Sequence, residues 1–297
     1  MQPRSKNIKF IGVPFRSGAN REGAQNAPKW LLEHLPMLED ACSILQFQSE
    51  DAPLTDTETC GVKNYDAVLH MVKTVRAEVV SALADYKRVL VMGGDHSIAM
   101  GSIAGVLEYC PDVGVIWFDA HTDINTETSS PSGNAHGMPL AALMGLCKSE
   151  INYKDKKLNP VNVFWVGARD IDNGEREIIK RLGIEDHVYT SEMVHRIGMK
   201  AVMKEIQDRL KANKVGHLHL SFDIDGMDPL IVPATSTPVA MGLSEIECDR
   251  FIEELGTGMP QVVSIDFVEY NPMLDDDTHT TGNWCLSVCG KLVNILE

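Results

Sequence analysis

Short apolar runs alternate with amphipathic segments along the whole chain, and this alternation is the feature that most restricts the fold. Most runs are apolar on both faces, as strands covered on both sides of a sheet require. The clearest intervening helix is expected at residues 64–87, where valines recur every three or four positions. The pattern predicts a parallel sheet with helices on both faces. Strands are expected at residues 8–13, 43–47, 89–92, 113–118, 161–166, 187–190, 217–222 and 262–267.

Composition limits the class of protein further. The 297 residues are 44% hydrophobic, which is enough for one large core, so we predict a single domain over residues 1–297. The net charge is −15, and the sequence has no basic stripe of the kind that binds nucleic acid. Nucleic acid is therefore excluded as a partner, and a cationic small molecule is favoured over a phosphorylated one.

Cysteine usage and hydropathy bear on location. Seven cysteines form an odd set without a CxxC pair, which is typical of a reducing compartment. No run approaches the roughly 18 apolar residues of a membrane span. The first strand is expected to begin at Ile8 without a hydrophobic leader before it. We expect a cytoplasmic protein that does not contact membranes.

Acidic residues and a histidine follow two of the apolar runs. Asp119, His121 and Asp123 come directly after one run, and Asp223 and Asp225 come after another. In an extended chain, alternate residues point the same way, so each set is predicted to converge at the carboxyl end of a strand. Four carboxylates and an imidazole would repel one another unless divalent cations lay among them. Oxygen-rich ligation suits Mn²⁺, Mg²⁺ or Fe²⁺ better than zinc, and we predict a binuclear manganese site.

Three other segments are expected near the same edge. Gly93-Gly94-Asp95-His96-Ser97 follows a predicted strand, and its glycines permit a sharp turn that brings His96 to the edge, before a helix expected at residues 98–110. The Ser- and Asn-rich stretch 125–136 is predicted to be a loop that carries recognition groups. The acidic run 275–277 is expected to be a solvated loop. Each motif alone has an ordinary explanation, a turn, a cap or a core histidine, and only the combination indicates a site.

Two divalent ions that share carboxylates can lower the pKa of one water molecule and orient it, so hydrolysis is the expected chemistry. A phosphoesterase would need Arg, Lys or backbone amides beside the metals. Here the edge carries the carboxylates of Glu269 and Asp172. These acids favour a cationic electrophile such as a guanidinium group.

Three long motifs resemble the signatures of the ureohydrolases, and of the arginases within them. They are residues 93–97 (GGDHS), 119–125 (DAHTDIN) and 221–229 (SFDIDGMDP). The resemblance implies an arginase-like, three-layer α/β fold whose eight-stranded, mostly parallel sheet has helices on both faces. It also implies two Mn²⁺ per subunit, a homotrimer, and conversion of L-arginine and water to L-ornithine and urea through attack of a metal-bridging hydroxide on the guanidinium carbon.

The same resemblance implies roles for individual residues. His96 and Asp123 would bind one manganese, His121 and Asp225 the other, and Asp119 and Asp223 would bridge the two. Glu269 would pair with the guanidinium, Asp123 would give a proton to the leaving amine, and His136 would carry protons to and from solvent. The residues implied in substrate binding are Asn125, Ser130, Ser132, Asn134, Asp172, Glu175 (through water) and Thr237. Ser236 replaces the usual glycine and Pro131 a usual hydroxyl residue, which affects the water-mediated contacts.

Three alternatives differ in chemistry. An agmatinase or guanidinobutyrase would act on a guanidino substrate without an α-carboxylate, and the loop 125–134 with Asp172 argues against it. A catalytically silent metal-binding protein of the same fold would lack a ligand, Glu269 or His136, and all are present. A binuclear phosphoesterase would need cationic phosphate contacts.

Overall fold

The computed structural model describes residues 7–35, 42–47, 58–85, 88–153 and 156–297. Within them, eight strands form one sheet in the order β2-β1-β5-β10-β9-β6-β7-β8, and every pair is parallel. The strands are β1 (Ile8–Val13), β2 (Cys42–Ile44), β5 (Arg88–Gly93), β6 (Gly114–Phe118), β7 (Val163–Ala168), β8 (Val188–Thr190), β9 (His217–Asp223) and β10 (Gln261–Val268). A separate antiparallel pair joins β3 (Glu58–Thr59) to β4 (Val62–Lys63).

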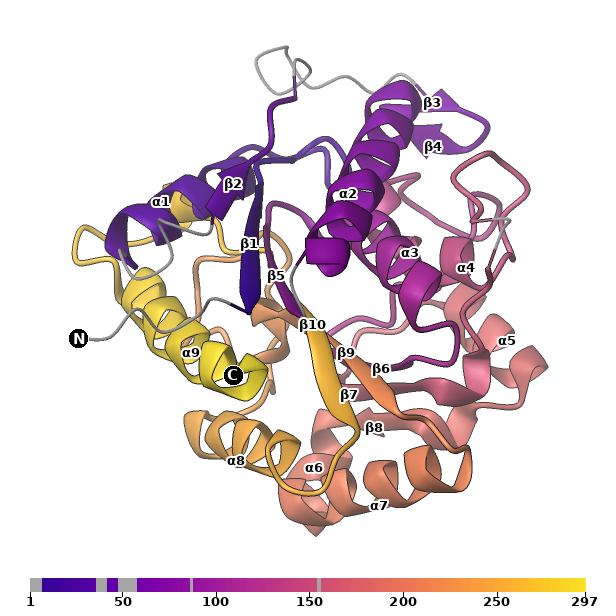
Figure 1. The fold of residues 1–297 in the computed structure, drawn as a ribbon, viewed down its shortest axis with the longest axis vertical. Coiled ribbons are helices and arrows are strands. Elements are labelled where there is room, and N and C mark those ends of the chain that lie inside the picture. The colour runs from indigo at the N-terminus through magenta and orange to yellow at the C-terminus, as the bar shows by residue number, and fades with distance from the viewer. Residues whose placement is uncertain (1–6, 36–41, 48–57, 86–87, 154–155) are drawn as a thin grey trace.

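Helices cover both faces of the sheet, which makes a three-layer structure (Figure 1). One apolar core lies between the sheet and α2 (Tyr65–Asp85), α3 (Ala99–Tyr109), α4 (Pro139–Leu143) and α5 (Asn173–Leu182). The other lies under α1 (Ala27–His34), α6 (Ser191–Ile197), α7 (Met199–Ala212), α8 (Glu245–Leu255) and α9 (Thr280–Leu296). The predicted fold class, a parallel sheet between two helical layers, is confirmed.

All eight predicted strands are present; β1 has the predicted ends, and the other seven are shifted at one or both ends. The second was expected to reach residue 47, but β2 ends at Ile44. It is an edge strand that pairs only with β1, and β1 itself ends at Val13, so no partner backbone continues alongside it. Phe47 instead packs edge-on against Phe15, with ring centroids 5.6 Å apart. The strand expected from residue 161 begins at Val163, because Pro160–Asn162 forms a 3-10 turn.

Helix boundaries follow the predictions closely. The helix expected at 64–87 is α2, which begins at Tyr65 and is described as far as Asp85; residues 86–87 lie outside the described part of the chain. The helix expected at 98–110 is α3, from Ala99 to Tyr109. The amphipathic period located the start of α2 to within one residue, and the helix expected after the Gly-Gly turn was located to within one residue at each end.

Strand order positions the site. β5, β10, β9 and β6 are adjacent in the sheet although the sequence separates them widely. Their carboxyl ends therefore lie side by side, and the segments that follow all four strands meet at one edge of the sheet. This edge receives each of the three motifs and Glu269, which directly follows β10.

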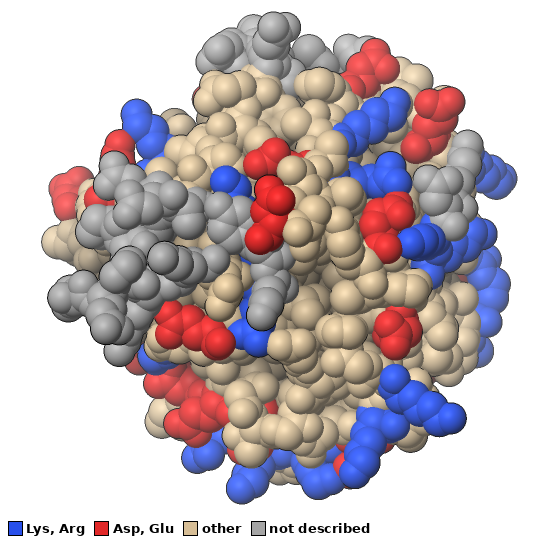
Figure 2. Space-filling view, in the orientation of Figure 1, with Lys and Arg blue, Asp and Glu red and all other residues tan. Residues whose placement is uncertain are grey.

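Charged side chains of both signs occur on the molecular face in Figure 2. Lys and Arg side chains gather toward the side where α5 and α7 lie, and Asp and Glu are scattered elsewhere over this face. Among the described residues, no helix is both long enough and apolar enough to cross a membrane.

The acidic run 275–277 corrects one prediction, because it is not simply a solvated loop. The Asp275 side chain accepts hydrogen bonds from the backbone N–H groups of Thr281 (3.1 Å) and Gly282 (2.8 Å), and from the Tyr270 hydroxyl (2.9 Å). It thereby satisfies backbone donors in the first turn of α9 that have no partner within the helix. A pattern of charge alone does not distinguish this capping role from a solvated loop.

Asp275→Ala should lower the free energy of unfolding by roughly 1–3 kcal/mol, because it leaves the α9 backbone donors and the Tyr270 hydroxyl without an acceptor. Chemical denaturation with an unchanged m-value measures the effect. Asp277→Ala is the matched control in the same run: the residue is exposed, and its removal should change stability by less than about 0.5 kcal/mol. Equal losses from both variants would show that the cap is not the cause.

Candidate metal centre

The turn after β5 brings His96 to the edge of the sheet. A Cβ on Gly94 would lie 1.9 Å from the Phe15 carbonyl oxygen, so only glycine fits this turn. Asp95 then caps the following 3-10 turn by accepting the Ser97 N–H at 3.0 Å. The backbone N–H of His96 donates to Glu269 Oε1 at 2.8 Å, which joins this turn to the end of β10.

The ligand residues after β6 converge through a bent backbone, and the predicted extended geometry was wrong. β6 ends at Phe118, and the His121 N–H folds back to Asp119 Oδ1 at 2.7 Å. Asp123 has a φ of 47°, in the left-handed region that few non-glycine residues adopt. The bends arise because these residues lie beyond the last sheet pairing, where carboxylates accept local backbone N–H groups instead.

The residues after β9 bend in the same way. Asp223 is the last residue of its strand, and its Oδ1 accepts the N–H of Asp225 at 2.8 Å. Asp225 lies in a 3-10 turn, Ile224–Gly226, and its Oδ1 accepts the N–H of Ala120 at 3.1 Å. This last bond ties the segment after β9 directly to the segment after β6.

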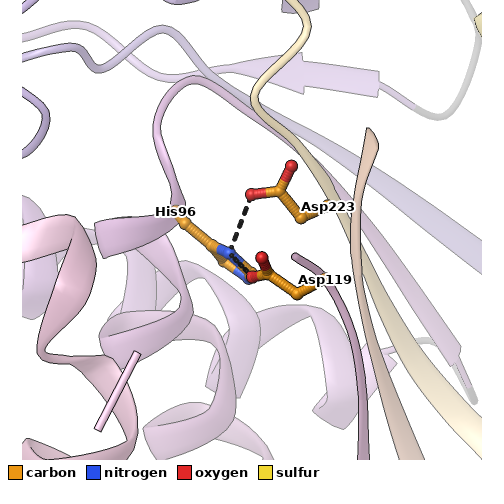
Figure 3. A group of neighbouring side chains, drawn as sticks. All are labelled: His96, Asp119 and Asp223. Atoms are coloured by element: carbon orange, nitrogen blue, oxygen red, sulfur yellow. Dashed lines mark ion pairs between the residues drawn. The ribbon is translucent and has the colours of Figure 1, made fainter. Parts of the chain in front are cut away.

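Three carboxylates surround one nitrogen of His96. Nδ1 of His96 lies 3.0 Å from Asp119 Oδ2, 3.2 Å from Asp123 Oδ2 and 3.1 Å from Asp223 Oδ2. Figure 3 shows His96, Asp119 and Asp223 pointing toward one another from three separate segments. These three ligand atoms lie close enough together to hold one cation.

A second group of the same kind includes His121. Its Nδ1 lies 3.3 Å from Asp119 Oδ1 and 3.2 Å from Asp225 Oδ2. Asp119 thus belongs to both groups and directs one oxygen to each. Asp223 belongs only to the group that contains His96. Each of the two groups could hold one cation, and Asp119 contributes an oxygen to both groups.

Burial and crowding shift the pKa values of the cluster. Burial, followed by the charge of Asp119, raises the pKa of Asp123 to about 6 and also raises the pKa of Asp225. For Asp223, burial and then the charge of Asp225 raise the pKa well above its usual value. Burial opposes ionisation of Asp119 as well, but hydrogen bonds from His121 and His96 outweigh it and lower that pKa. In the absence of cations, the cluster therefore ionises fully only at considerable energetic cost.

The residues present fit divalent metal ions. Nδ1 of His96 is buried and has no hydrogen-bond partner of acceptable geometry, although it faces three carboxylate oxygens. One N–H cannot satisfy three acceptors, whereas a cation placed among them would be bound by all four groups. His96 Nε2 is held by the Ser221 hydroxyl at 2.8 Å, which leaves Nδ1 facing the carboxylates.

A cavity of about 120 Å³ opens above the cluster. Most of the predicted site residues line it, together with Asp170 and Gly137: His121, Asp123, Asn125, Ser130, Ser132, His136, Asp172, Glu175, Asp223, Asp225 and Thr237. His96 and Asp119 are not among the lining residues and are nearly fully buried, at 1% exposed each. The cavity is therefore walled by carboxylates, hydroxyls and amides, with the proposed ligands at its base.

Two further predicted site residues, Asn134 and Glu269, are not among the cavity lining. Asn134 donates its side-chain N–H to the Ala19 carbonyl at 3.2 Å. Glu269 is 1% exposed, and its Oε1 lies 3.4 Å from Nδ1 of His136, which does line the cavity. Its other oxygen is buried without a hydrogen-bond partner.

The loop that contains the predicted recognition residues is fixed from several sides. Asn125 donates to Asp172 Oδ2 at 2.9 Å, and Ser130 accepts the Gly133 N–H at 3.0 Å. Glu175 binds the backbone N–H of Ile124 at 3.1 Å and that of Asp172 at 2.9 Å. Burial, and then the charge of Asp123, raises the pKa of Glu175 to about 7.

Two positions where the sequence departs from the motif lie outside the cavity lining. Ser236 is buried, and its hydroxyl accepts a hydrogen bond from the Asn271 side chain at 3.4 Å. Pro131 is exposed. Neither side chain is part of the wall that a ligand in this cavity would contact.

Sequence reasoning missed several supporting residues. Trp117 donates its indole N–H to Asp119 Oδ2 at 2.9 Å, and its ring stacks on His96 at 4.1 Å between centroids. Asp95 accepts the backbone N–H groups of Gly18 and Ala19 at 2.8 and 3.0 Å. The only available signals were the place of Trp117 two residues before a ligand and that of Asp95 inside a motif.

A parallel three-layer α/β fold with a buried His–Asp cluster at the carboxyl edge of its sheet defines a metal-dependent hydrolase. Comparison with known proteins identifies the family. A sequence model of the arginase family matches residues 6–293. The chain belongs to the arginase family.

Individual relatives agree with this assignment. The arginase of Staphylococcus aureus (strain MRSA252) is 35% identical over 286 residues, which cover 93% of this chain and 94% of that protein. The crystal structure of the Bacillus subtilis arginase has a TM-score of 0.86 at 36% identity, covering 97% of this chain and 98% of that one. The Entamoeba histolytica arginase, solved in complex with L-ornithine, has a TM-score of 0.84 at 34% identity, with coverage of 96% and 98%.

Proposed function

We propose that this protein hydrolyses L-arginine to L-ornithine and urea with two Mn²⁺ ions per subunit. The observation that carries the proposal is the pair of ligand groups that share Asp119 at the base of an acid-lined cavity. Family membership supports the reaction, and the L-ornithine complex of the Entamoeba histolytica relative supports the product.

Six side chains would hold the metal ions. His96, Asp123 and Asp223 converge on one position and His121 and Asp225 on the other, with Asp119 directed to both. When bound, the two cations would lower the pKa of a water molecule and make it a nucleophile near neutral pH. The family resemblance implies that Asp223 would help Asp119 to hold both cations; in this structure Asp223 Oδ2 faces His96 and Oδ1 accepts the Asp225 N–H.

The substrate guanidinium is positively charged, because its pKa is about 13.8. The buried carboxylate of Glu269, with one oxygen lacking a partner, is the group proposed to pair with it. The Glu269 side chain is held by the His96 N–H and lies beside His136, so its position is fixed before substrate arrives. A fixed carboxylate would orient the guanidinium carbon toward the metal-binding side chains.

Breaking the bond between the guanidinium carbon and the ornithine nitrogen requires a proton on the leaving amine. We assign this donation to Asp123, which lines the cavity and whose Oδ2 lies 3.2 Å from Nδ1 of His96 at the metal-binding cluster. His136 would replace the proton. Burial opposes protonation of His136, but the hydrogen bond and charge of Glu269 outweigh it and raise its pKa to about 9, so His136 carries a proton at neutral pH.

The far end of the substrate carries an α-amino and an α-carboxylate group. Asn125, Ser130 and Ser132 line the cavity with donors suited to the carboxylate, and Asp172 offers an acceptor to the amino group. Thr237 also lines the cavity and donates to Asp225 Oδ2 at 3.0 Å. Asn134 and Glu175 are proposed to contribute indirectly, Asn134 by holding the loop and Glu175 through water.

The deciding experiment measures urea release from L-arginine and from agmatine, together with the metal content of the purified protein. An arginase releases urea from arginine and retains two Mn²⁺ per chain. Faster release from agmatine would favour the agmatinase alternative. No release from either substrate at full metal content would favour the catalytically silent alternative.

Asp172→Asn should raise KM for L-arginine about 10- to 100-fold and leave metal content unchanged. The substitution removes the charge that would pair with the α-amino group, and such charged hydrogen bonds contribute about 1.5–3 kcal/mol. An amide oxygen can still accept the Asn125 side-chain N–H, so the loop contact is preserved. Steady-state kinetics give KM; a loss confined to kcat would contradict the assigned role.

We further propose that residues 1–297 form one catalytic domain, that three subunits assemble, and that the protein works in the cytoplasm without nucleic-acid or membrane partners. The shared layers and continuous sheet support a single domain. Sedimentation velocity tests the trimer directly.

A further inference from the structure

Arg169 is the most heavily hydrogen-bonded side chain near the site, and no catalytic or metal-binding role uses it. It follows β7 directly, and all the hydrogen bonds that its guanidinium donates to the described residues go to backbone carbonyl oxygens. Those of Asp225 (2.8 Å), Gly226 (3.1 Å) and Met227 (3.1 Å) belong to the turn after β9. The others are the carbonyls of Gly167 (3.1 Å), Val239 (2.7 Å from Nη2) and Ala240 (3.1 Å).

These bonds hold one wall of the site. The turn 225–227 contains the ligand Asp225, and residues 239–240 follow shortly after Thr237, which donates to that same ligand. The Arg169 backbone N–H also donates to the Ala120 carbonyl at 2.7 Å, between Asp119 and His121. Arg169 therefore contacts the backbone of both segments that supply the His121 group.

Arg169 contacts neither His96 nor Asp223 by any described hydrogen bond. The described hydrogen bonds of the His96 group instead join His96 to Ser221 and Glu269, and Asp119 to Trp117. Arg169 therefore holds the turn of Asp225 directly, and it reaches the His96 group only indirectly, through the shared Asp119 and the Asp225 N–H bonded to Asp223. A change at Arg169 should affect the two metal positions unequally.

We propose that Arg169 is a positioning residue that sets the geometry of the second metal position, the one formed by Asp119, His121 and Asp225. The inference rests on the proposed binuclear site. If Arg169 acted through its charge alone, it would weaken metal binding, because a cation beside the site repels divalent ions. Burial lowers the pKa of Arg169, while the charges of Asp225 and Asp119 act against that shift, so the guanidinium lies near the cluster in a partly dry environment.

Geometry and charge predict different outcomes for two substitutions. Arg169→Lys keeps the positive charge but loses the planar fork, and one ammonium cannot reach six carbonyls. Arg169→Met removes the charge and keeps most of the apolar stem. If Arg169 acts by positioning, both variants should weaken binding of the second Mn²⁺ by about 10- to 100-fold, as loss of supporting contacts commonly does.

The test titrates Mn²⁺ into metal-free protein by isothermal calorimetry and follows the bound ions by electron paramagnetic resonance. Wild type should bind two ions and give the signal of a coupled pair. The two variants should bind the first ion with unchanged affinity and, at one equivalent, give the six-line signal of isolated Mn²⁺. Arg209→Met is the matched control, since Arg209 forms an ion pair with Asp186 at 2.7 Å on the surface and should leave both affinities unchanged.

Three results would overturn the inference. Wild-type binding in Arg169→Lys with tighter binding in Arg169→Met would assign the effect to charge. Equally weakened binding of both ions, together with a lower melting temperature, would show that the substitution destabilises the whole fold. Binding of both ions with wild-type affinity in both variants would remove any role in metal binding. Wild-type protein that binds fewer than two ions would instead contradict the proposed function.

Discussion

Asp223→Ala should reduce kcat by at least about a thousandfold and lower the Mn²⁺ content of the purified protein. The Asp223 carboxylate is 3.1 Å from His96 Nδ1 and is one of three that face this nitrogen. Metal activation of water contributes several kcal/mol to such reactions, and each 1.36 kcal/mol corresponds to about tenfold in rate. Removing one ligand should therefore abolish most of the activity.

A second substitution separates ligation from folding. Asp223 also accepts the backbone N–H of Asp225, and Asp223→Asn keeps an oxygen for that bond while removing the negative charge. Its melting temperature should be close to that of Asp223→Ala or higher, with metal content still reduced. Metal analysis by mass spectrometry and urea release measure the two effects independently.

Ser132→Ala is the control within the same cavity. Ser132 lines the wall and accepts the Asn134 N–H at 3.2 Å, but lies in no ligand group. Its loss should mainly raise KM and leave metal content at the wild-type value. Similar kinetic damage and similar metal loss in Asp223→Ala and Ser132→Ala would contradict the assignment of ligands and substrate contacts.

Removal of metal by chelation should lower the melting temperature markedly. An ion present at about a thousand times its Kd stabilises the folded state by roughly 4 kcal/mol. For a chain of this size that corresponds to roughly 5–15 °C. The loss arises at the cluster, where carboxylates that the cations would neutralise face one another in a buried site.

The difference in melting temperature between metal-loaded and metal-free protein should grow as pH rises from 5 to 7. The raised pKa of Asp123, about 6, lies above its unfolded value, as do the raised values of Asp223 and Asp225. Such groups stabilise the metal-free fold below the unfolded pKa of about 3.9, and this contribution is lost as pH rises through the folded pKa. Metal binding strengthens over the same range, because ligands must lose protons first.

Scanning calorimetry in chelator and in excess Mn²⁺, at several pH values, measures this difference. Carboxyl groups outside the site titrate in the same way in the metal-loaded and the metal-free protein, so their contributions to the difference in melting temperature cancel. One of them is Glu108, whose hydrogen bonds from Tyr153 and Arg76 lower its pKa to about 2. A difference that stays constant from pH 5 to 7 would show that the cluster does not titrate as described.

The sequence predicted much of the fold because the local spacing of apolar residues indicates which faces of a strand or helix are buried. Short runs, most of them apolar on both faces, marked all eight strands, and the valine spacing marked α2. Strand ends were less accurate where a neighbour decides them, as at β2, whose last pairing joins Ile44 to Gly12, one residue before the end of β1. The order of the strands could not be read from these local patterns, since it depends on which surfaces pack together.

The sequence named residues of the candidate site but did not predict the backbone conformation that brings them together. Asp119, His121 and Asp225 were named from their spacing, yet the extended geometry that motivated the choice is absent, and Asp123 adopts a left-handed backbone instead. The capping role of Asp275 was missed for a similar reason, since its partners lie in the following helix.

By itself, the sequence determined the alternation of strands and helices and placed metal-binding side chains at strand ends, because both depend on neighbouring residues. Only the tertiary structure decided that β5, β10, β9 and β6 lie side by side, that Asp119 faces two histidines, and that Arg169 fixes the turn carrying Asp225. These features depend on hydrogen bonds and packing between residues far apart in the chain. Their geometry is set only when the whole sheet has formed.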